Sequence, residues 1–186
     1  MYERFTDRSR KVLQLANMTA HEFGQEFIST EHVLIGLIKE GGGVAAYVLK
    51  NLGCDLEKIK QSVLELTQHS ETSEPAKTHR LPHAPRTGRV IEYAIESAKK
   101  LNHSYVGTEH ILLGLCREHE GAASQILMKH GVTDVMIEQN VLNLLGVNSV
   151  CVEYNKLQKE LEKAVADQDL EKSKRLTKQI KTLTTK

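Results

Sequence analysis

The sequence has no tryptophan, few other aromatic residues and only three prolines in 186 residues. Because aromatic residues make up 4% of the chain, any core must be built from aliphatic side chains. No apolar run approaches the length of about 18 residues that a membrane-spanning helix needs, and the opening segment MYERFTDRSRK does not resemble a signal peptide. We therefore expect no membrane contact and a cytoplasmic location.

The chain also has few cysteines and a net charge close to zero. The three cysteines (Cys54, Cys116 and Cys151) are widely spaced and odd in number, which argues against a disulfide framework and favours a reducing compartment. The formal net charge of +1 offers no bulk attraction to nucleic acid. From Glu153 to Lys186 nine Lys or Arg stand against six Asp or Glu, an excess that is typical of a solvated helix. We expect protein partners and no nucleic acid.

The clearest feature that is present is an internal repeat at an offset of 78 residues. The segment STEHVLIGLIKE, from Ser29 to Glu40, aligns without a gap with GTEHILLGLCRE, from Gly107 to Glu118. More than half of these twelve positions are identical, and the register continues on both sides. Repetition over this length is typical of a chain built from two copies of one structural unit. We place the two units at about residues 5–68 and 85–146.

Each unit has a pattern that predicts four helices. Apolar residues recur at helical spacing, and glycines mark the breaks between the periodic segments. Thr30 and Thr108 are expected to cap the second helix of their units, while Asp55 and Thr133 are expected to cap the fourth. No segment alternates with period two for long enough to predict a sheet. The predicted fold class is all-α, with two four-helix repeats packed as a pseudo-symmetric pair.

The Ser/Thr-rich residues 69–84 hold Pro75 and Pro82 and are predicted to form an extended linker. The double repeat is therefore assigned to residues 1–147, and residues 150–186 are assigned to a C-terminal helical hairpin. Two narrow apolar stripes predict the hairpin: Leu157, Leu161 and Ala164 form the first, Leu176, Ile180 and Leu183 form the second, and Asp167-Gln168-Asp169 makes the turn. Stripes this narrow bury little by themselves, and they permit a homodimer through the hairpin.

Taken together, these residues resemble the N-terminal domain of Clp ATPases, most closely that of the ClpC branch. The resemblance rests on RFTDRSRKVL near the start, on the doubled TEH block and on the NLG and LLG endings, and it covers roughly residues 2–146. It implies two four-helix repeats related by a pseudo-twofold axis. It also implies protein partners, namely Clp unfoldase or protease subunits, adaptors or client proteins, including proteins marked by arginine phosphorylation.

The C-terminal segment is similar to the UVR motif, a helical hairpin of ClpC middle domains, of the McsA adaptor and of the UvrB excision-repair protein. Leu170-Glu171-Lys172 stands where the motif usually has Phe-Glu-Lys. Ser173-Lys174 and Lys178 depart from the alanines and the acidic residue that are usual there. These departures weaken the expectation of a UVR-type contact surface.

The residues needed for the chemistry of the full-length relatives are missing. The string Gly-x-x-x-x-Gly-Lys-Ser/Thr, which holds nucleotide phosphates, does not occur, and Gly41-Gly42-Gly43 is better explained as a break between helices. The nine histidines form no convincing zinc pattern. His79 and His83 are four residues apart, but they lie in the proline-bearing linker and not on a predicted helix. Cys116 lies on an apolar helix and is interpreted as a core residue. We expect no enzyme activity, no cofactor and no metal.

Glu31 and Glu109 are the strongest candidates for a binding site. Each is the glutamate of a TEH block in the first turn of a predicted helix, where a carboxylate also stabilises the helix dipole. From the residues alone, both interpretations stay open. The resemblance assigns the two glutamates to recognition of phosphorylated arginine, because a carboxylate accepts the guanidinium N–H groups in a forked arrangement.

The phosphate of such a ligand requires cations and hydroxyl groups. Arg8 and Arg86 occupy equivalent positions near the start of each unit, and as candidates for binding phosphate they are joined by the hydroxyl-bearing Thr6, Thr30 and Thr108. Solvated surface arginines are the competing interpretation. Ala84 stands where the second repeat of the family usually has a threonine, so the second phosphate site is expected to be the weaker one.

The leading hypothesis is a non-enzymatic module that binds substrates or adaptors of a Clp protease and works without an attached ATPase. One alternative is the front of a longer ClpC-type unfoldase. The order of segments argues against this, because the UVR-like hairpin directly follows the repeats here and the chain ends soon after it, as a complete small protein would. The other alternative is a protein that docks a UvrB-like partner through the hairpin.

Overall fold

The computed structural model describes residues 2–68 and 80–146, together with residues 157, 160–161, 163–165, 167 and 169–184. It divides into two compact units, Met1–Val141 and Leu142–Lys186. Within the described residues every regular element is a helix, which confirms the predicted all-α fold class. The remaining paired backbone consists of two isolated parallel bridges, Phe5 with Val106 and Ile28 with His83.

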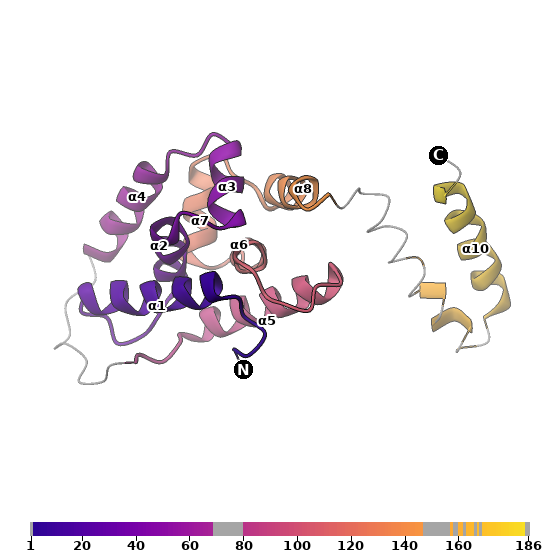
Figure 1. Cartoon of the computed structure of the whole chain (residues 1–186), viewed down its shortest axis with the longest axis horizontal. Helices are drawn as coiled ribbons and strands as arrows, with labels where there is room; N and C mark the ends of the chain where they lie inside the picture. The colour runs from indigo at the N-terminus through magenta and orange to yellow at the C-terminus, as the bar shows by residue number, and fades with distance from the viewer. Residues whose placement is uncertain are drawn as a thin grey trace. The chain divides into compact units, whose positions relative to one another are not determined.

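The two repeats contribute four helices each, drawn in Figure 1. The first repeat contains α1 (Asp7–Glu22), α2 (Thr30–Glu40), α3 (Val44–Asn51) and α4 (Leu56–Gln68). The second contains α5 (Pro85–Lys100), α6 (Thr108–Arg117), α7 (Ala122–Lys129) and α8 (Asp134–Leu144). The predicted caps of the fourth helices are confirmed, because Asp55 accepts hydrogen bonds from the N–H groups of Glu57 and Lys58, and Thr133 accepts one from Met136.

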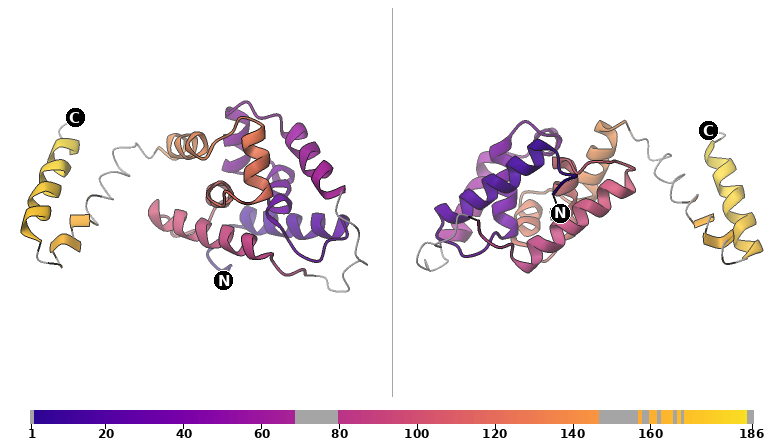
Figure 2. Two further views of the ribbon diagram at one scale, coloured as in Figure 1. Left: turned by 180° about the vertical axis from the view of Figure 1, so that it is seen from behind. Right: turned by 60° about the horizontal axis from the view of Figure 1, so that its bottom comes forward.

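The core lies around α2 and α6, which the views in Figures 1 and 2 place in the middle of the helices. Each packs against its own repeat and against the opposite one: α2 contacts α5 and α7, while α6 contacts α1 and α3. This exchange of equivalent partners is what a twofold relation between the repeats produces. The interior is aliphatic, as the composition predicts, with Leu34, Leu49 and Ile111 fully buried.

Two glycines allow the first two helices of each repeat to cross closely. A Cβ atom at Gly36 in α2 would overlap the carbonyl oxygen of Val12 in α1. Gly114 in α6 stands in the same relation to Val90 in α5. Because both glycines belong to the doubled TEH block, the repeat carries its closest backbone contact in its most similar segment.

The predicted caps of α2 and α6 were wrong by one residue. Ser29 and Gly107 are the N-cap residues, and Thr30 and Thr108 begin the helices. The hydroxyl of Thr30 accepts a hydrogen bond from the backbone N–H of Ala123 in α7 at 3.3 Å, and that of Thr108 accepts one from Ala45 in α3, also at 3.3 Å. These threonines therefore join the two repeats instead of capping their own helices.

The end of the predicted linker belongs to the folded unit. Leu81 is 2% exposed, and its backbone N–H donates to the side chain of Asn17 at 2.9 Å. Backbone hydrogen bonds then join Ile28 to Pro82 and Ala84 to Ile28, immediately before α5 begins. The rest of the predicted linker, residues 69–79, lies outside the described residues, so the boundaries 69–84 and 1–147 stay predictions.

The second unit contains helical residues between 157 and 165, a turn at Asp167 and α10 (Leu170–Thr184). Asp169 caps α10, since its carboxylate accepts a hydrogen bond from the N–H of Lys172 at 3.0 Å. Ala164, Leu176 and Ile180 are buried, in agreement with the predicted stripes. The side chain of Leu183 and residues 150–156 of the predicted hairpin lie outside the described part.

In the part of the chain that the structure describes, no single helix is both long and apolar enough to cross a membrane. Taken together, α2 and α3 have the length and apolar composition of a membrane span, but the two helices are bent by 90° at the break between them.

Candidate binding site

The predicted site residues do not gather repeat by repeat. Glu31 and Thr30, from α2 of the first repeat, share one cavity with Arg86, from α5 of the second. On the other side of the pseudo-twofold relation, the N–H of Thr6 donates to the backbone oxygen of Val106, just before α6, at 3.1 Å. Arg8 lies against Gly42, and Thr108 lies against the adjacent Gly43. Two composite sites result, each with residues from both repeats.

The Glu31 cavity has a volume of about 580 Å³. Its lining comes from the starts of α2, α5 and α7 and from the segments just before them: Ser29, Thr30, Glu31, Ala84, Pro85, Arg86, Arg89, Glu120 and Ala122. Three helix N-termini therefore meet at one opening. Because a helix N-terminus carries partial positive charge, this convergence favours an anionic group.

Glu31 lines this cavity as a partly buried carboxylate. Its Oε2 accepts a hydrogen bond from the hydroxyl of Thr30 at 3.3 Å. Burial raises the pKa of Glu31, and the hydrogen bonds from Thr30 and from its own backbone N–H partly offset that rise. A carboxylate held in this way still has acceptor capacity for a guanidinium or ammonium donor.

Two arginines on α5 supply the positive charge. Arg89 makes a bidentate contact with Glu118, with both N–O distances at 2.8 Å, and this contact raises the pKa of Arg89. Arg86 donates to the backbone oxygen of Glu120 at 2.8 Å and to its carboxylate at 3.1 Å. Sequence reasoning missed Arg89, although its spacing of three residues from Arg86 on a predicted helix places both on one face.

The Glu109 site differs in its access. Glu109 is 3% exposed, and its carboxylate lies against Gly107, where a side chain at this N-cap position would overlap it. Burial raises the pKa of Glu109. On the same side, Arg8 pairs with the carboxylate of Glu40 at 2.8 Å, and the side chain of Glu40 is 3% exposed. The Glu109 carboxylate is thus packed into the fold, whereas that of Glu31 lines an open cavity.

Ala84 lies in the Glu31 cavity and not in the Glu109 site. By its register Ala84 corresponds to Thr6, which is the N-cap of α1 and belongs to the Glu109 site. The threonine that the second repeat lacks is therefore missing beside Glu31. Sequence reasoning had assigned it to the second repeat alone, because the crossing of the repeats is not visible from the order of residues.

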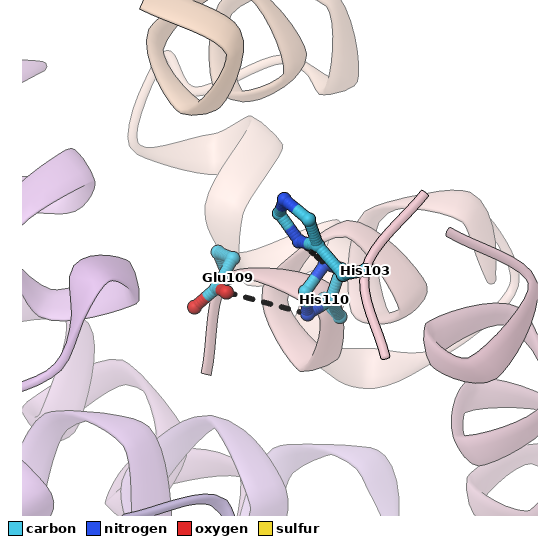
Figure 3. A group of neighbouring side chains, drawn as sticks. All are labelled: His103, Glu109 and His110. Carbon is cyan, nitrogen blue, oxygen red and sulfur yellow. Dashed lines mark hydrogen bonds and ion pairs between the residues drawn. The ribbon is translucent and has the colours of Figure 1, made fainter. Parts of the chain in front are cut away.

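Among the described residues, one group of His, Cys, Asp and Glu side chains has the proximity of metal ligands: His103, Glu109 and His110, shown in Figure 3. Nδ1 of His110 accepts a hydrogen bond from the N–H of Gly107 at 2.8 Å, so the neutral ring carries its proton on Nε2. That Nε2–H faces Nδ1 of His103 at 2.9 Å. Glu109 instead approaches Nδ1 of His110, at 3.3 Å.

This arrangement favours a hydrogen-bonded chain over a metal centre. Glu109 and His103 approach different nitrogens of the His110 ring. A ligating histidine normally donates its second ring N–H to an acceptor, whereas the second ring nitrogen of His110 is itself an acceptor. Burial, together with His103, lowers the pKa of His110 to about 4, which keeps the ring neutral.

A second cavity, of about 470 Å³, lies between α1 and the segment before α5. Its lining is Tyr2, Arg10, Leu13, Gln14, Asn17, Ile28, Arg80 and His83. Tyr2 closes one side, with its hydroxyl 3.3 Å from Nε2 of His83 and the guanidinium of Arg80 over its ring. Among the described residues that line this cavity there is no carboxylate, so they lack the pairing of acidic and basic groups found at Glu31.

Comparison of the sequence with known proteins identifies a matching family and several relatives. The profile of the Clp repeat (R) N-terminal domain matches residues 4–130. The negative regulator of genetic competence ClpC/MecB of Bacillus subtilis is 47% identical over 148 residues, which cover 80% of this chain and 18% of that protein. The chaperone protein ClpB of Oceanobacillus iheyensis is 45% identical over 148 residues, with the same shares covered. The matched region thus spans about a fifth of the length of these relatives.

Solved structures show the same fold. The N-terminal domain of ClpD from Arabidopsis thaliana matches with a TM-score of 0.65 and 24% identity, covering 78% of this chain and 97% of that one. The Hsp104 N-terminal domain from Candida albicans matches with a TM-score of 0.67 and 20% identity, covering 78% of this chain and 94% of that one. At these identities the likeness concerns the fold alone.

Proposed function

This chain belongs to the family of Clp repeat (R) N-terminal domains, and on that premise we propose that it is a non-enzymatic module that binds substrates or adaptors of a ClpC-type unfolding and degradation machine. The Glu31 cavity is the proposed binding site, and arginine-phosphorylated protein is the proposed ligand. The observation that carries the proposal is the meeting of two carboxylates, two arginines and three helix N-termini at a single opening.

A phosphorylated arginine has two ends that need opposite partners. Its guanidinium N–H groups require an acceptor, which the carboxylate of Glu31 provides. Its phosphate requires cations and positive helix ends, which Arg86, Arg89 and the starts of α2, α5 and α7 provide. A cavity with only one sign of charge would select one end of this ligand and repel the other.

The Glu109 site is proposed as a weaker second copy. Thr6, Arg8 and Thr108, which the sequence names as candidates for binding phosphate, would be its phosphate-side residues. Its carboxylate is buried against Gly107, so a ligand has to displace existing packing before it reaches Glu109. The loss of the threonine at Ala84 weakens the Glu31 cavity by one hydroxyl contact, which is a smaller cost than opening a buried site.

Relatives support a role in binding protein. One solved structure with this fold is a complex of a ClpV N-domain with a VipB peptide, which matches with a TM-score of 0.60 at 15% identity. An ATP-dependent unfoldase subunit is the second candidate function, favoured by the observation that the matched curated relatives are about five times longer than the matched region. The UVR-like docking role, a homodimer through the second unit and the cytoplasmic location stay predictions.

The test is a calorimetric titration of the full chain with phosphoarginine, with arginine and inorganic phosphate as comparison ligands. We expect Glu31→Gln to weaken phosphoarginine binding by roughly tenfold or more, because a hydrogen bond to a charged group contributes about 1.5–3 kcal/mol. Glu109→Gln is expected to weaken binding by less than about threefold, since its carboxylate is already packed into the fold.

Circular dichroism of each variant serves as the folding control. Equal affinity in the wild type and in folded Glu31→Gln contradicts the assignment of Glu31. Absence of phosphoarginine binding to the wild type contradicts the proposed ligand.

A further inference from the structure

The two composite sites differ at one position in the loop that follows α2 or α6. Gly42 in the first repeat aligns with Glu120 in the second. In the first repeat the guanidinium of Arg8 occupies the space at this position, since a Cβ atom at Gly42 would overlap Arg8. In the second repeat the equivalent arginine, Arg86, instead pairs with the side chain of Glu120.

The two acidic residues at the Glu31 cavity hold its arginines differently. Glu118 is buried, with 5% of its side chain exposed, and it binds Arg89 through two hydrogen bonds of 2.8 Å. Glu120 is 72% exposed and reaches Arg86 through a single carboxylate oxygen at 3.1 Å. The same oxygen lies 4.0 Å from Arg89. Glu118 therefore fixes the orientation of Arg89, while Glu120 covers both guanidinium groups from the solvent side.

Resting on the proposed function, we propose that the Glu120 carboxylate is an internal competitor for the anionic end of the ligand in the Glu31 cavity. An incoming phosphate requires the N–H group of Arg86 that Glu120 binds, and the same carboxylate oxygen lies 4.0 Å from Arg89. The carboxylate leaves without an unpaired buried charge, because it is exposed to water in either position. At the Glu109 site Gly42 has no side chain, and Arg8 pairs with the buried Glu40 instead, so an exposed competing carboxylate is found at the Glu31 cavity alone of the two sites.

The balance of charges around the cavity also supports competition by Glu120. Glu31, Glu118 and Glu120 bring three carboxylates to two guanidinium groups, so the arginines are already neutralised before a ligand arrives. Displacement of Glu120 leaves two carboxylates beside the two guanidinium groups and frees the N–H group of Arg86 that a phosphate needs. Since Arg86 also donates to the backbone oxygen of Glu120 at 2.8 Å, the loop stays attached to Arg86 while the carboxylate moves away.

The test titrates phosphoarginine, and separately arginine, into the full chain, Glu120→Gln and Glu138→Gln. Glutamine at 120 keeps the shape of the side chain and removes only its charge. Glu138 is exposed on α8 and does not line the cavity, so Glu138→Gln is matched for net charge. We expect Glu120→Gln to bind phosphoarginine about threefold to fivefold more tightly than the wild type, which is the range of a single exposed ion pair.

Further outcomes separate this inference from the function on which it rests. Glu138→Gln is expected to match the wild type, and arginine, which lacks a phosphate, is expected to gain nothing from Glu120→Gln. Unchanged or weaker phosphoarginine binding by Glu120→Gln, beside normal binding by the wild type, overturns the inference and leaves the proposed function standing. An equal gain for arginine or in Glu138→Gln also overturns it. If neither the wild type nor Glu120→Gln binds phosphoarginine, both the function and the inference fall.

Discussion

Thr6 and Ala84 occupy equivalent positions in the two repeats, and one hydroxyl separates them. Oγ1 of Thr6 accepts a hydrogen bond from the N–H of Ser9 at 3.2 Å and lies 2.9 Å from the hydroxyl of Ser9. Ala84 is the N-cap of α5 and makes no side-chain capping bond. The hydroxyl of Thr87, which corresponds to Ser9, is buried without a hydrogen-bond partner. The alanine therefore leaves the start of α5 without a side-chain cap, and Thr87 lacks the hydroxyl contact that Ser9 has with Thr6.

We expect Ala84→Thr to raise the free energy of unfolding by about 1 kcal/mol, because it restores an N-cap and supplies a partner for Thr87. Thr6→Ala is expected to lower it by about the same amount. Urea denaturation of the two variants and the wild type measures both changes. If Ala84→Thr has no effect while Thr6→Ala destabilises, the two helix starts are not equivalent in the way that their register indicates.

At the residue scale, the sequence singled out some of the residues that line the cavity, and the binding role of these residues stays a prediction. Glu31 and Arg86 stand out because each belongs to a doubled motif, and both line one cavity. Thr30 was named for the wrong role, since a threonine before a helix is indistinguishable by pattern from one that begins it. Glu120 was not predicted because nothing repeats there: its counterpart is a glycine, and a role that only one repeat has leaves no trace in self-comparison.

The elements depend on glycine where α1 meets α2 and α5 meets α6. Gly36→Ala and Gly114→Ala are each expected to lower the free energy of unfolding by roughly 1–3 kcal/mol, because a methyl group would be forced into the carbonyl oxygen of the facing helix. Chemical denaturation followed by circular dichroism provides the measurement.

Gly88 is the matched control within α5. A Cβ atom at Gly88 would meet nothing within 4 Å, so Gly88→Ala is expected to stabilise the protein by roughly 0.5–1 kcal/mol through helix propensity alone. Destabilisation by Gly88→Ala, or stability unchanged by Gly36→Ala, would contradict the assignment of the cost to close helix crossing.

At the scale of the whole molecule, stability is expected to fall as the pH decreases from about 6.5 to about 4. Burial lowers the pKa values of His32 and His110 to about 4, from an ordinary value of 6.5. In this range the unfolded chain takes up protons that the folded chain refuses, so each histidine removes up to about 1.4 kcal/mol of stability per pH unit. The raised pKa values of Glu31 and Glu109 act in the opposite sense, as the pH falls through those values.

Urea denaturation at pH values from 7.5 to about 5 measures this slope. His32→Gln keeps a side-chain acceptor for the N–H of Ser29 while removing one titrating ring. It is expected to reduce the slope by less than half, because burial also lowers the pKa of His83. His110→Gln, on the equivalent helix, is a second variant with the same expectation. A slope that neither folded variant reduces would mean that other groups govern the acid sensitivity.

The sequence by itself determined the elements of this protein: the doubled unit, the all-α class and the helices that follow from local periodicity and capping. These properties depend on residues within a few turns of one another, and the sequence records them directly. Only the tertiary structure decided which residues of the two repeats line one cavity. Glu31 meets Arg86 and Arg89 across a separation of more than fifty residues, because α2 packs against α5 and α7 of the opposite repeat. Which helices of opposite repeats meet depends on how the aliphatic faces of the two repeats bury each other. The local pattern of each helix would be the same if each repeat packed only against itself, so the sequence pattern does not record this contact.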